Sequence, residues 1–397
     1  MKTGTLPSNI YKLYVIKISH WLMLTMPVIL IFYNANNLSV RHLFVIQAAY
    51  SLTIVLFELP SGYLADRWGR KKTLVTGAIL NFGGYLLYSV SFGFEGFLMA
   101  QIMLGMGQSF MSGSDTAMLY DTLVSENKQH QYLKIEGRMT SVGNFAEALA
   151  GIIAGFLLMI SPRFPFVCQA FVALLAVPAS LMLTEPPLPS SLGKPRIKEL
   201  IHTLKNVLFV QHSLRRNLWL SSVLGASTLT MAWFVQPFFQ SVEIPETLYG
   251  LLWTLLNASV GLTALIAYRI ERRLGEKRSV QWVIFVTTLG YLTLSISNSI
   301  WGLFFIFVFY LARGIATPVL KDYLNKELSS ETRASVLSLR SLMIRGIFTA
   351  LGPVWGWTTD HLSLSAALLM AGMTYLIFAL PFAGLFFSVK NQTKKTV

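Results

Sequence analysis

The sequence is poor in charged residues. Asp, Glu, Lys and Arg make up only 13% of its 397 residues, whereas a soluble domain carries about 25%. Hydrophobic residues account for 54%, and the mean hydropathy is +0.56. A surface with so little charge cannot face water on all sides, so the composition predicts a protein embedded in lipid.

Residues that carry enzyme chemistry are also scarce. The single cysteine, Cys168, excludes an intramolecular disulfide framework and a multi-cysteine metal site. The six histidines are scattered, and the sequence has no Gly-x-Ser-x-Gly elbow, no His-Glu-x-x-His motif and no Walker loop. We therefore expect no metal and no cofactor, and no direct use of ATP hydrolysis; a polytopic membrane enzyme is the alternative of a different class.

Apolar runs long enough to cross a bilayer recur along the whole chain. A crossing helix needs about 20 apolar residues, and the first run, from Tyr14 to Phe32, is too long for a cleaved signal peptide. The pattern predicts an all-α integral membrane protein with about twelve transmembrane helices in two pseudo-symmetric six-helix bundles. The expected spans are 11–33, 42–64, 74–93, 96–119, 139–160, 165–184, 217–240, 248–268, 279–298, 300–319, 333–357 and 364–389.

Acidic residues are fewer than basic ones, 18 against 32, which gives a net charge of +14. In a soluble protein this excess would suggest a nucleic-acid partner. Here 26 of the basic residues fall on one side of the predicted spans, and the opposite loops contain only Arg41 and Arg163. Cytoplasmic loops of membrane proteins are enriched in Lys and Arg, so we expect both termini in the cytoplasm and no nucleic-acid partner. Short outer loops without disulfides favour a bacterial cytoplasmic membrane.

The longest loop, about 185–216, divides the chain. It opens with several prolines and continues with apolar residues at helical spacing among basic ones, which predicts an amphipathic helix at the membrane surface. We expect an N-terminal six-helix bundle at 1–190, a linker with this helix at 191–216, and a C-terminal six-helix bundle at 217–397. Repeated bundles with a site between them are a common plan for transporters.

The two halves also share sequence motifs. Glu136-Gly-Arg138 precedes the fifth predicted span and Glu331-Thr-Arg333 precedes the eleventh, at an offset of 195 residues. A basic, glycine-containing segment follows the second span, and a related one at 269–278 follows the eighth.

The first of these segments resembles the signature loop between helices two and three of the major facilitator superfamily of secondary transporters. Phe57–Ser61 and Glu185-Pro186 are also similar to that family. The resemblance covers the whole chain and implies alternating access, with this loop as a conformational latch. The residues of this gating motif are Gly62, Asp66, Arg67, Gly69, Arg70 and Lys71.

Each residue of the motif has a physical reason to be there. We expect Gly62 to let two helices approach closely, and Asp66 to meet a helix N-terminus, most plausibly that of span eleven. The basic residues can pair with carboxylates of neighbouring loops. The alternative is that they only hold the loop in the cytoplasm.

Ionisable groups inside the predicted spans are few. Each costs about 2.5–3.5 kcal/mol to insert, so each is a functional candidate. The resemblance implies that helices one, four, seven and ten line the cavity. Our candidates for the substrate cavity are Lys17, His20, Asp115, Trp233, Arg313 and Arg345. The alternative for the charged ones is a salt bridge that closes the inner gate, and Arg340 is expected to bridge to a carboxylate near the inner face.

Three carboxylates are candidates for proton coupling. Glu147, near the middle of span five, is the first, with Glu58 and Asp115 behind it, because burial can raise the pKa of a carboxyl towards neutrality. Permanent pairing with a basic residue is the alternative for Glu147. The polar residues Ser227 to Gln236 of span seven could line the cavity or hydrogen-bond between helices.

The sequence thus predicts a monomeric secondary active transporter that moves a small solute together with protons through the lipid bilayer. A lipid flippase and a passive facilitator of the same fold stay open. Span five contains Gly151 and Gly155 but not the glycine-proline motif of the superfamily's drug–proton antiporters, which counts against drug efflux.

Overall fold

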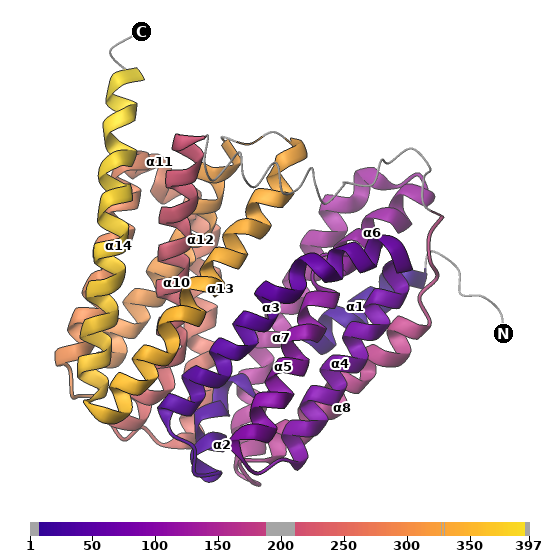
Figure 1. Cartoon of the computed structure of the whole chain (residues 1–397), viewed down its shortest axis with the longest axis horizontal. Coiled ribbons are helices and arrows are strands. Elements are labelled where there is room, and N and C mark those ends of the chain that lie inside the picture. The colour runs from indigo at the N-terminus through magenta and orange to yellow at the C-terminus, as the bar shows by residue number, and fades with distance from the viewer. Residues whose placement is uncertain (1–7, 188–210, 327, 329, 394–397) are drawn as a thin grey trace. The chain divides into compact units, whose positions relative to one another are not determined.

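The computed structural model describes residues 8–187, 211–326, 328 and 330–393, and every regular element among them is a helix (Figure 1). The chain divides into two compact units. Unit 1 contains Met1–Ser39, Ala49–Lys194 and Pro245–Thr254, and unit 2 contains Val40–Ala48, Pro195–Ile244 and Leu255–Val397. Two helices, α3 and α11, therefore contribute residues to both units.

The first half of the sequence forms eight α-helices. Within unit 1, α4 lies beside α5 and α8 (Figure 1). The helices are α1 (Ser8–Trp21), α2 (Ile29–Ala35), α3 (Val40–Trp68), α4 (Arg70–Val90), α5 (Phe94–Met111), α6 (Ser114–Ser125), α7 (Tyr132–Leu158) and α8 (Phe164–Leu181), with short 3₁₀ helices η1 (Met26–Val28) and η2 (Gln129–Gln131).

The second half forms five α-helices in the described residues. Within unit 2, α10 packs against α12, α13 and α14. The helices are α10 (His212–Ser241), α11 (Tyr249–Ile296), α12 (Gly302–Lys326), α13 (Ser330–His361) and α14 (Leu364–Thr393), with η3 (Glu246–Leu248) before α11.

The helices of the described residues account for ten to twelve membrane spans. Ten described helices are long and apolar enough to cross a membrane. Helix α11 has 48 residues, about 72 Å at 1.5 Å per residue, which is more than twice the ~30 Å hydrocarbon core of a bilayer. It holds two spans because Gly275 interrupts it with a φ of 75°, and α5 with α6 supplies the remaining span.

A positive-φ glycine separates the paired spans in each half. Gly69 has a φ of 97° between α3 and α4, and Gly275 occupies the matching place in the second basic segment. A side chain with a Cβ rarely adopts this conformation. The backbone thus repeats at the place where the sequence repeats, although we expected a loop at 269–278 and the chain is helical on both sides of Gly275.

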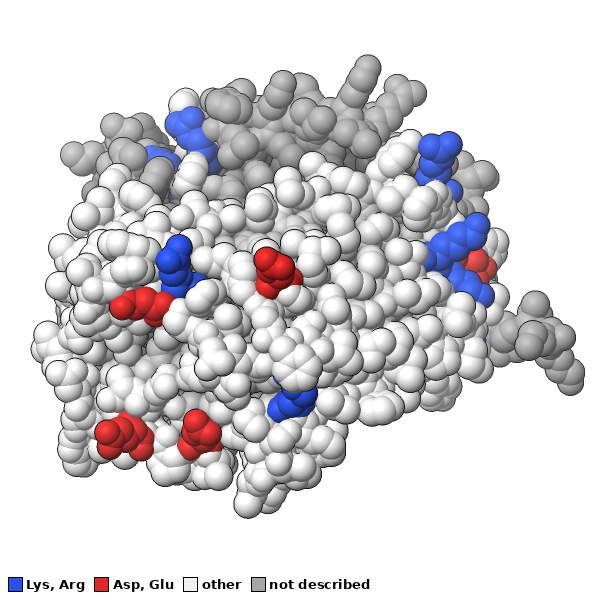
Figure 2. Space-filling view, turned by 60° about the horizontal axis from the view of Figure 1, so that its bottom comes forward, with Lys and Arg blue, Asp and Glu red and all other residues white. Residues whose placement is uncertain are grey.

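Large apolar side chains cover much of the exterior. Phe145, Leu265 and Ile296 are more than two-thirds exposed, and Figure 2 shows a face with few charged side chains among the described residues. Lipid, not water, solvates such a surface. The fold is therefore the all-helical membrane fold that the sequence predicts.

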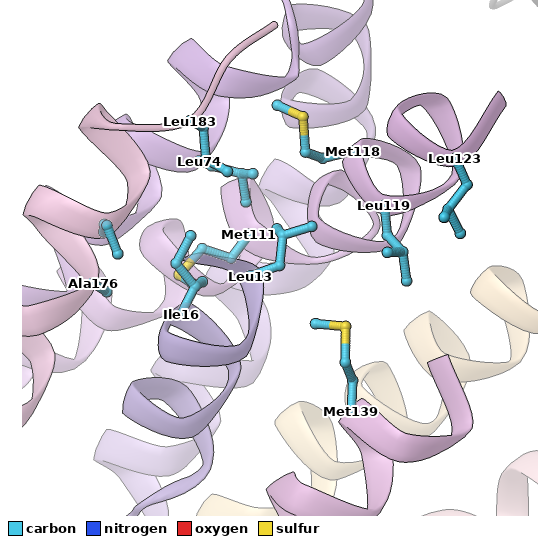
Figure 3. Close-up of a cluster of buried hydrophobic side chains, with 12 residues drawn as sticks. Leu13, Ile16, Leu74, Met111, Met118, Leu119, Leu123, Met139, Ala176 and Leu183 are labelled. Carbon is cyan, nitrogen blue, oxygen red and sulfur yellow. The ribbon is translucent and has the colours of Figure 1, made fainter. Parts of the chain in front are cut away.

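A buried apolar cluster in unit 1 joins α1, α4, α5, α6, α7 and α8 (Figure 3). Leu13 and Ile16 of α1 pack there with Met111 of α5 and Met118 of α6. The cluster fixes the inner ends of these helices relative to one another. The predicted amphipathic helix at 191–216 lies largely outside the described residues, and the division at 1–190 and 217–397 stays a prediction.

The basic residue Arg163, predicted to lie in an outer loop, is held in place by several hydrogen bonds. Its guanidinium donates to the carbonyl oxygens of Ser89 and Ser91, at 2.9 and 2.6 Å, and to Oδ1 of Asn36 at 2.8 Å. It also lies 4.0 Å from the ring centroid of Phe92. A cation that caps the C-terminal carbonyls of α4 is favourable, so Arg163 has a structural reason to depart from the charge bias.

Replacing Arg163 with methionine is expected to lower the free energy of unfolding by about 2 kcal/mol or more, because hydrogen bonds to a charged group are lost and carbonyl groups lose their donors. Thermal unfolding of the purified protein in detergent measures the effect. Arg41→Met is the control, since Arg41 is exposed and contacts Asp360 through its backbone amide. Equal melting temperatures for both variants would contradict this role.

Candidate functional site

Span four is a broken helix. Helix α5 ends at Met111 and α6 begins at Ser114, and between them Gly113 adopts a left-handed φ of 75°. The span expected at 96–119 is therefore made of two helices, because the polar run Ser112-Gly113-Ser114 interrupts it. Irregular backbone at membrane depth is tolerated only where it is buried in protein or lines a cavity, so the break marks a place where a site is expected.

Span one is broken as well. Helix α1 ends at Trp21, and the chain passes through η1, which contains Pro27, before α2 begins. The backbone amide of Leu24 in this break donates to Oε1 of Gln169, at 2.7 Å. The same amide donates to the carbonyl oxygen of Leu22 at 3.2 Å, so a buried glutamine from α8 supplies the shorter of its two hydrogen bonds where the helix is interrupted.

A cavity of about 250 Å³ lies beside these two breaks. Both helix ends supply its walls, and Ile16 and Met111 belong also to the apolar cluster of Figure 3. We call it the unit 1 pocket. Its lining residues are Ile16, Lys17, His20, Trp21, Gln108, Met111, Ser112, Gly113, Asp115 and Thr116.

An ion pair occupies the unit 1 pocket. Nζ of Lys17 lies 3.2 Å from Oδ2 of Asp115 and 3.9 Å from Oε1 of Glu136. The side chains of the three residues are 12%, 21% and 22% exposed, in that order. Two carboxylates share one ammonium group, so the cluster has a net charge of −1 when His20 is neutral.

The helices stabilise this carboxylate. Asp115 lies in the first turn of α6, where the helix dipole favours negative charge. Its Oδ1 accepts a hydrogen bond from the backbone amide of Thr116 at 2.8 Å, which leaves Oδ2 for Lys17. The break in span four thus orients the carboxylate towards the pocket.

The structure brings together three of the predicted cavity residues, Lys17, His20 and Asp115. The other three belong to unit 2. Arg313 is half-buried with its guanidinium 5.6 Å from the ring centroid of Tyr310, Trp233 is buried in α10, and Arg345 is half-buried in α13. Their part in a substrate cavity stays a prediction.

The other two candidates for proton coupling lie in different helices of unit 1. Glu147 is half-buried in α7, and Glu58 is half-buried in α3 close to Pro60. Neither lines the unit 1 pocket. Their roles in proton coupling also stay predictions.

Sequence reasoning missed Glu136 as a site residue. We placed it in a cytoplasmic loop ahead of a span at 139–160, whereas α7 begins at Tyr132 and contains it. The repeated Glu-x-Arg motif at 136–138 was a signal for this position. Trp21 and Gln108 were also missed, since neither carries a charge that marks it in an apolar run.

The gating motif lies at the junction of α3 and α4. The carboxylate of Glu185 accepts hydrogen bonds from the backbone amides of Arg70 and Lys71, at 2.6 and 2.7 Å. The Glu185 carboxylate also packs closely against Gly69, since a Cβ added to Gly69 would lie 2.9 Å from Oε1 of Glu185. The N-cap residue of α4 is Gly69, and the carboxylate of Glu185, a residue that the family resemblance marked, takes the place of the side chain that this glycine lacks.

Arg70 joins the motif to α6. Its guanidinium lies 2.9 Å from Oδ1 of Asp66 and 3.7 Å from Oδ2 of Asp121. The expected pairing of a basic motif residue with a neighbouring carboxylate is present for Arg70, while Arg67 is exposed.

Two further expectations concern Gly62 of the motif and Arg340. A Cβ added to Gly62 would meet nothing within 4 Å, and its expected role in a close helix contact stays a prediction. Contrary to expectation, Arg340 forms no ion pair with a carboxylate among the described residues; it is buried, and its Nε donates to the hydroxyl of Ser221. In span seven, Thr230 hydrogen-bonds Tyr375 at 2.6 Å, which favours helix–helix bonding.

Replacing Glu185 with alanine is expected to lower the free energy of unfolding by about 1–2 kcal/mol, the usual cost of losing an N-terminal cap. Glu185→Gln should cost less, because one acceptor oxygen remains. Asp322→Ala is the control, since its pair with Lys326 is exposed and such pairs contribute under about 1 kcal/mol. If Glu185→Ala melts at the wild-type temperature in detergent, the cap has no effect on stability.

Comparisons with known proteins agree with this fold. The family model described as "Major Facilitator Superfamily" matches residues 18–353. The quinolone resistance protein NorA of Staphylococcus aureus is 26% identical over 164 residues, which is 41% of this chain and 41% of NorA. An uncharacterized transporter of Buchnera aphidicola is 32% identical over 79 residues, 20% of each chain. The matched segments thus span less than half the length of these curated relatives.

Solved structures resemble the chain over nearly its whole length. The nucleoside transporter NupG superposes with a TM-score of 0.81 and 14% identity, covering 97% of this chain and 100% of NupG. A D-xylose-proton symporter gives a TM-score of 0.75 and 15% identity, covering 95% and 96%. At such identities the likeness shows the fold alone. Because the family model matches most of the sequence, the chain belongs to the major facilitator superfamily of membrane transporters, which are not enzymes.

Proposed function

We propose that the chain is a proton-coupled secondary transporter of a small solute, and that Asp115 in the unit 1 pocket takes up the coupled proton. The observation that supports this is the cluster of one ammonium group and two carboxylates, with Lys17 at 3.2 Å from Asp115 and 3.9 Å from Glu136. A charged cluster at membrane depth is costly and is a functional candidate by default.

A proton on Asp115 would change this cluster in a defined way. Protonation removes the charge that holds Lys17 at 3.2 Å, and the ammonium group then has Glu136 as its remaining charged partner. The net charge of the cluster rises from −1 to zero. The site therefore has two arrangements that differ by one proton, which is what coupling to an alternating-access transition requires.

Export is the direction we propose. The support is the similarity to the quinolone resistance protein NorA over 41% of the chain. Span five contains Gly151 and Gly155 but no glycine-proline motif, which distinguishes the chain from the superfamily's drug–proton antiporters. We therefore propose efflux without assigning a drug as the substrate.

The test uses the purified protein in liposomes that contain a pH-sensitive dye. Addition of a transported solute should change the internal pH, and Lys12→Ala should keep this response because the Lys12 ammonium donates outside the pocket, to the carbonyl oxygen of Met182. Solutes that equilibrate across the membrane with no change in internal pH would overturn proton coupling and favour a passive facilitator.

A further inference from the structure

We propose that the unit 1 pocket binds a small organic ammonium ion, which takes the Asp115 carboxylate from Lys17. The inference rests on the proposed function of this pocket as the transport site. It adds the chemical class of the ligand, which none of the similarities to known proteins assigns.

The pocket already binds an ammonium group. Nζ of Lys17 is a tethered primary ammonium held by Oδ2 of Asp115 at 3.2 Å, with Oε1 of Glu136 at 3.9 Å. Hydrogen bonds between charged groups are stronger than neutral ones. A ligand that competes for these oxygens must therefore offer a similar cationic donor.

The charge balance leaves room for one more cation. Lys17 neutralises only one of the two carboxylates, and the cluster keeps a net charge of −1. A monovalent ammonium ligand on Asp115, with Lys17 retained by Glu136, makes the occupied site neutral. A carboxylate ligand would instead give the occupied site a net charge of −2, which is unfavourable inside a membrane protein.

The walls of the pocket suit an ammonium ion with a short apolar body. Ile16 and Met111 supply aliphatic surface, and Trp21 supplies an aromatic face, on which a cation gains a further attraction. The indole of Trp21 is held against α7, since a Cβ added to Gly143 would lie 3.0 Å from it. Gly113 borders open space, with nothing within 4 Å of an added Cβ.

The volume limits the size of the ligand. The cavity measures about 250 Å³, whereas sites for drug-sized ligands begin at about 300 Å³. A single aromatic ring with a short ammonium side chain is the size that we expect here. Phenethylammonium is therefore the probe. The control compounds of similar size are 2-phenylethanol, which is neutral, and phenylacetate, which is an anion.

The ligand and the proton compete for one negative charge. A proton on Asp115 and an ammonium ion beside it each bring the cluster from −1 to zero, so both cannot be favoured at once.

The experiment measures equilibrium binding of radiolabelled phenethylammonium to the purified full chain in detergent. The wild-type protein should bind phenethylammonium saturably and should bind neither 2-phenylethanol nor phenylacetate at the same concentrations. Asp115→Asn should weaken binding at least tenfold, and Lys17→Met should strengthen it several-fold, because the competing ammonium group is removed. Lys12→Met, on the same helix but outside the pocket, should leave binding unchanged.

A second variant keeps the test decisive if Lys17→Met does not fold. Lys17→Met with Glu136→Gln keeps the net charge of −1 on Asp115 alone, and it should bind phenethylammonium at least as tightly as wild type. Equal binding by Asp115→Asn, stronger binding of phenylacetate, or no binding of phenethylammonium by a folded wild-type protein would each overturn the proposal. Because binding needs no proton gradient, ammonium binding without proton coupling would refute the proposed function alone.

Discussion

Asp115→Asn is expected to slow strongly the accumulation of solute that a pH gradient drives. Asparagine has the shape of aspartate but carries neither the charge that holds the Lys17 ammonium group nor a carboxyl group that could take up a proton. Removing one partner of a fully buried ion pair costs several kcal/mol. The pair of Lys17 and Asp115 is partly exposed, so we expect a smaller energetic cost of about 1.4–3 kcal/mol. The initial rate of gradient-driven transport in proteoliposomes should fall about 10- to 100-fold.

Glu136→Gln is the matched variant for this prediction. Its oxygen lies at 3.9 Å from Lys17, against 3.2 Å for Asp115, so its removal should have the smaller effect on the rate. If Glu136→Gln abolishes transport and Asp115→Asn retains it, the order of the two carboxylates is wrong. Circular dichroism and melting temperature would show that both variants are folded.

Gly250→Ala is expected to have the largest effect on stability. Within unit 1, an added Cβ at Gly250 would lie 2.1 Å from the carbonyl oxygen of Gly151 and 3.0 Å from the amide nitrogen of Gly155. Backbone atoms cannot rotate away as a side chain can, so α7 and the start of α11 must separate. We expect a loss of about 3 kcal/mol in the free energy of unfolding, at the upper end of overpacking effects.

Gly261→Ala is the control on the same helix. An added Cβ there meets nothing within 4 Å, and alanine is a better helix former than glycine by up to about 1 kcal/mol. The melting temperature in detergent should therefore fall for Gly250→Ala and stay or rise for Gly261→Ala. Similar melting temperatures for the two would mean that the glycine contact does not hold these helices together.

Helix α6 joins the pocket to the gating motif. Asp115 lies in its first turn, and Asp121 lies six residues further along the helix, beside Arg70. At 1.5 Å per residue this is about 9 Å. A change in the contacts of Asp115 that shifts α6 must therefore also move the carboxylate that faces Arg70.

The sequence predicted the fold because lipid imposes simple rules on it. The predicted apolar runs correspond to the long apolar helices of the described residues, and the repeated basic segments correspond to Gly69 and Gly275. The breaks in spans one and four were not predicted. Hydropathy averages over a window of about 19 residues, and a two-residue interruption such as Ser112-Gly113 hardly changes that average.

The site was predicted in part. Lys17 and His20 share a face of one helix by their spacing, and the family resemblance placed Asp115 near them, as the structure does. Glu136 was missed because the start of α7 was placed seven residues too late, at 139 instead of Tyr132. Side-chain partners across helices, such as Glu185 with the amides of Arg70 and Lys71, depend on tertiary packing that no local pattern records.

The most direct test of the central claim compares Asp115→Asn with Glu147→Gln in liposomes that contain a pH-sensitive dye. Both changes remove one carboxylate from unit 1, but only Asp115 lines the pocket with Lys17. We predict that solute addition changes the internal pH for wild type and Glu147→Gln, and that Asp115→Asn gives no change. A normal response from Asp115→Asn together with none from Glu147→Gln would contradict the account and place the coupled proton in α7.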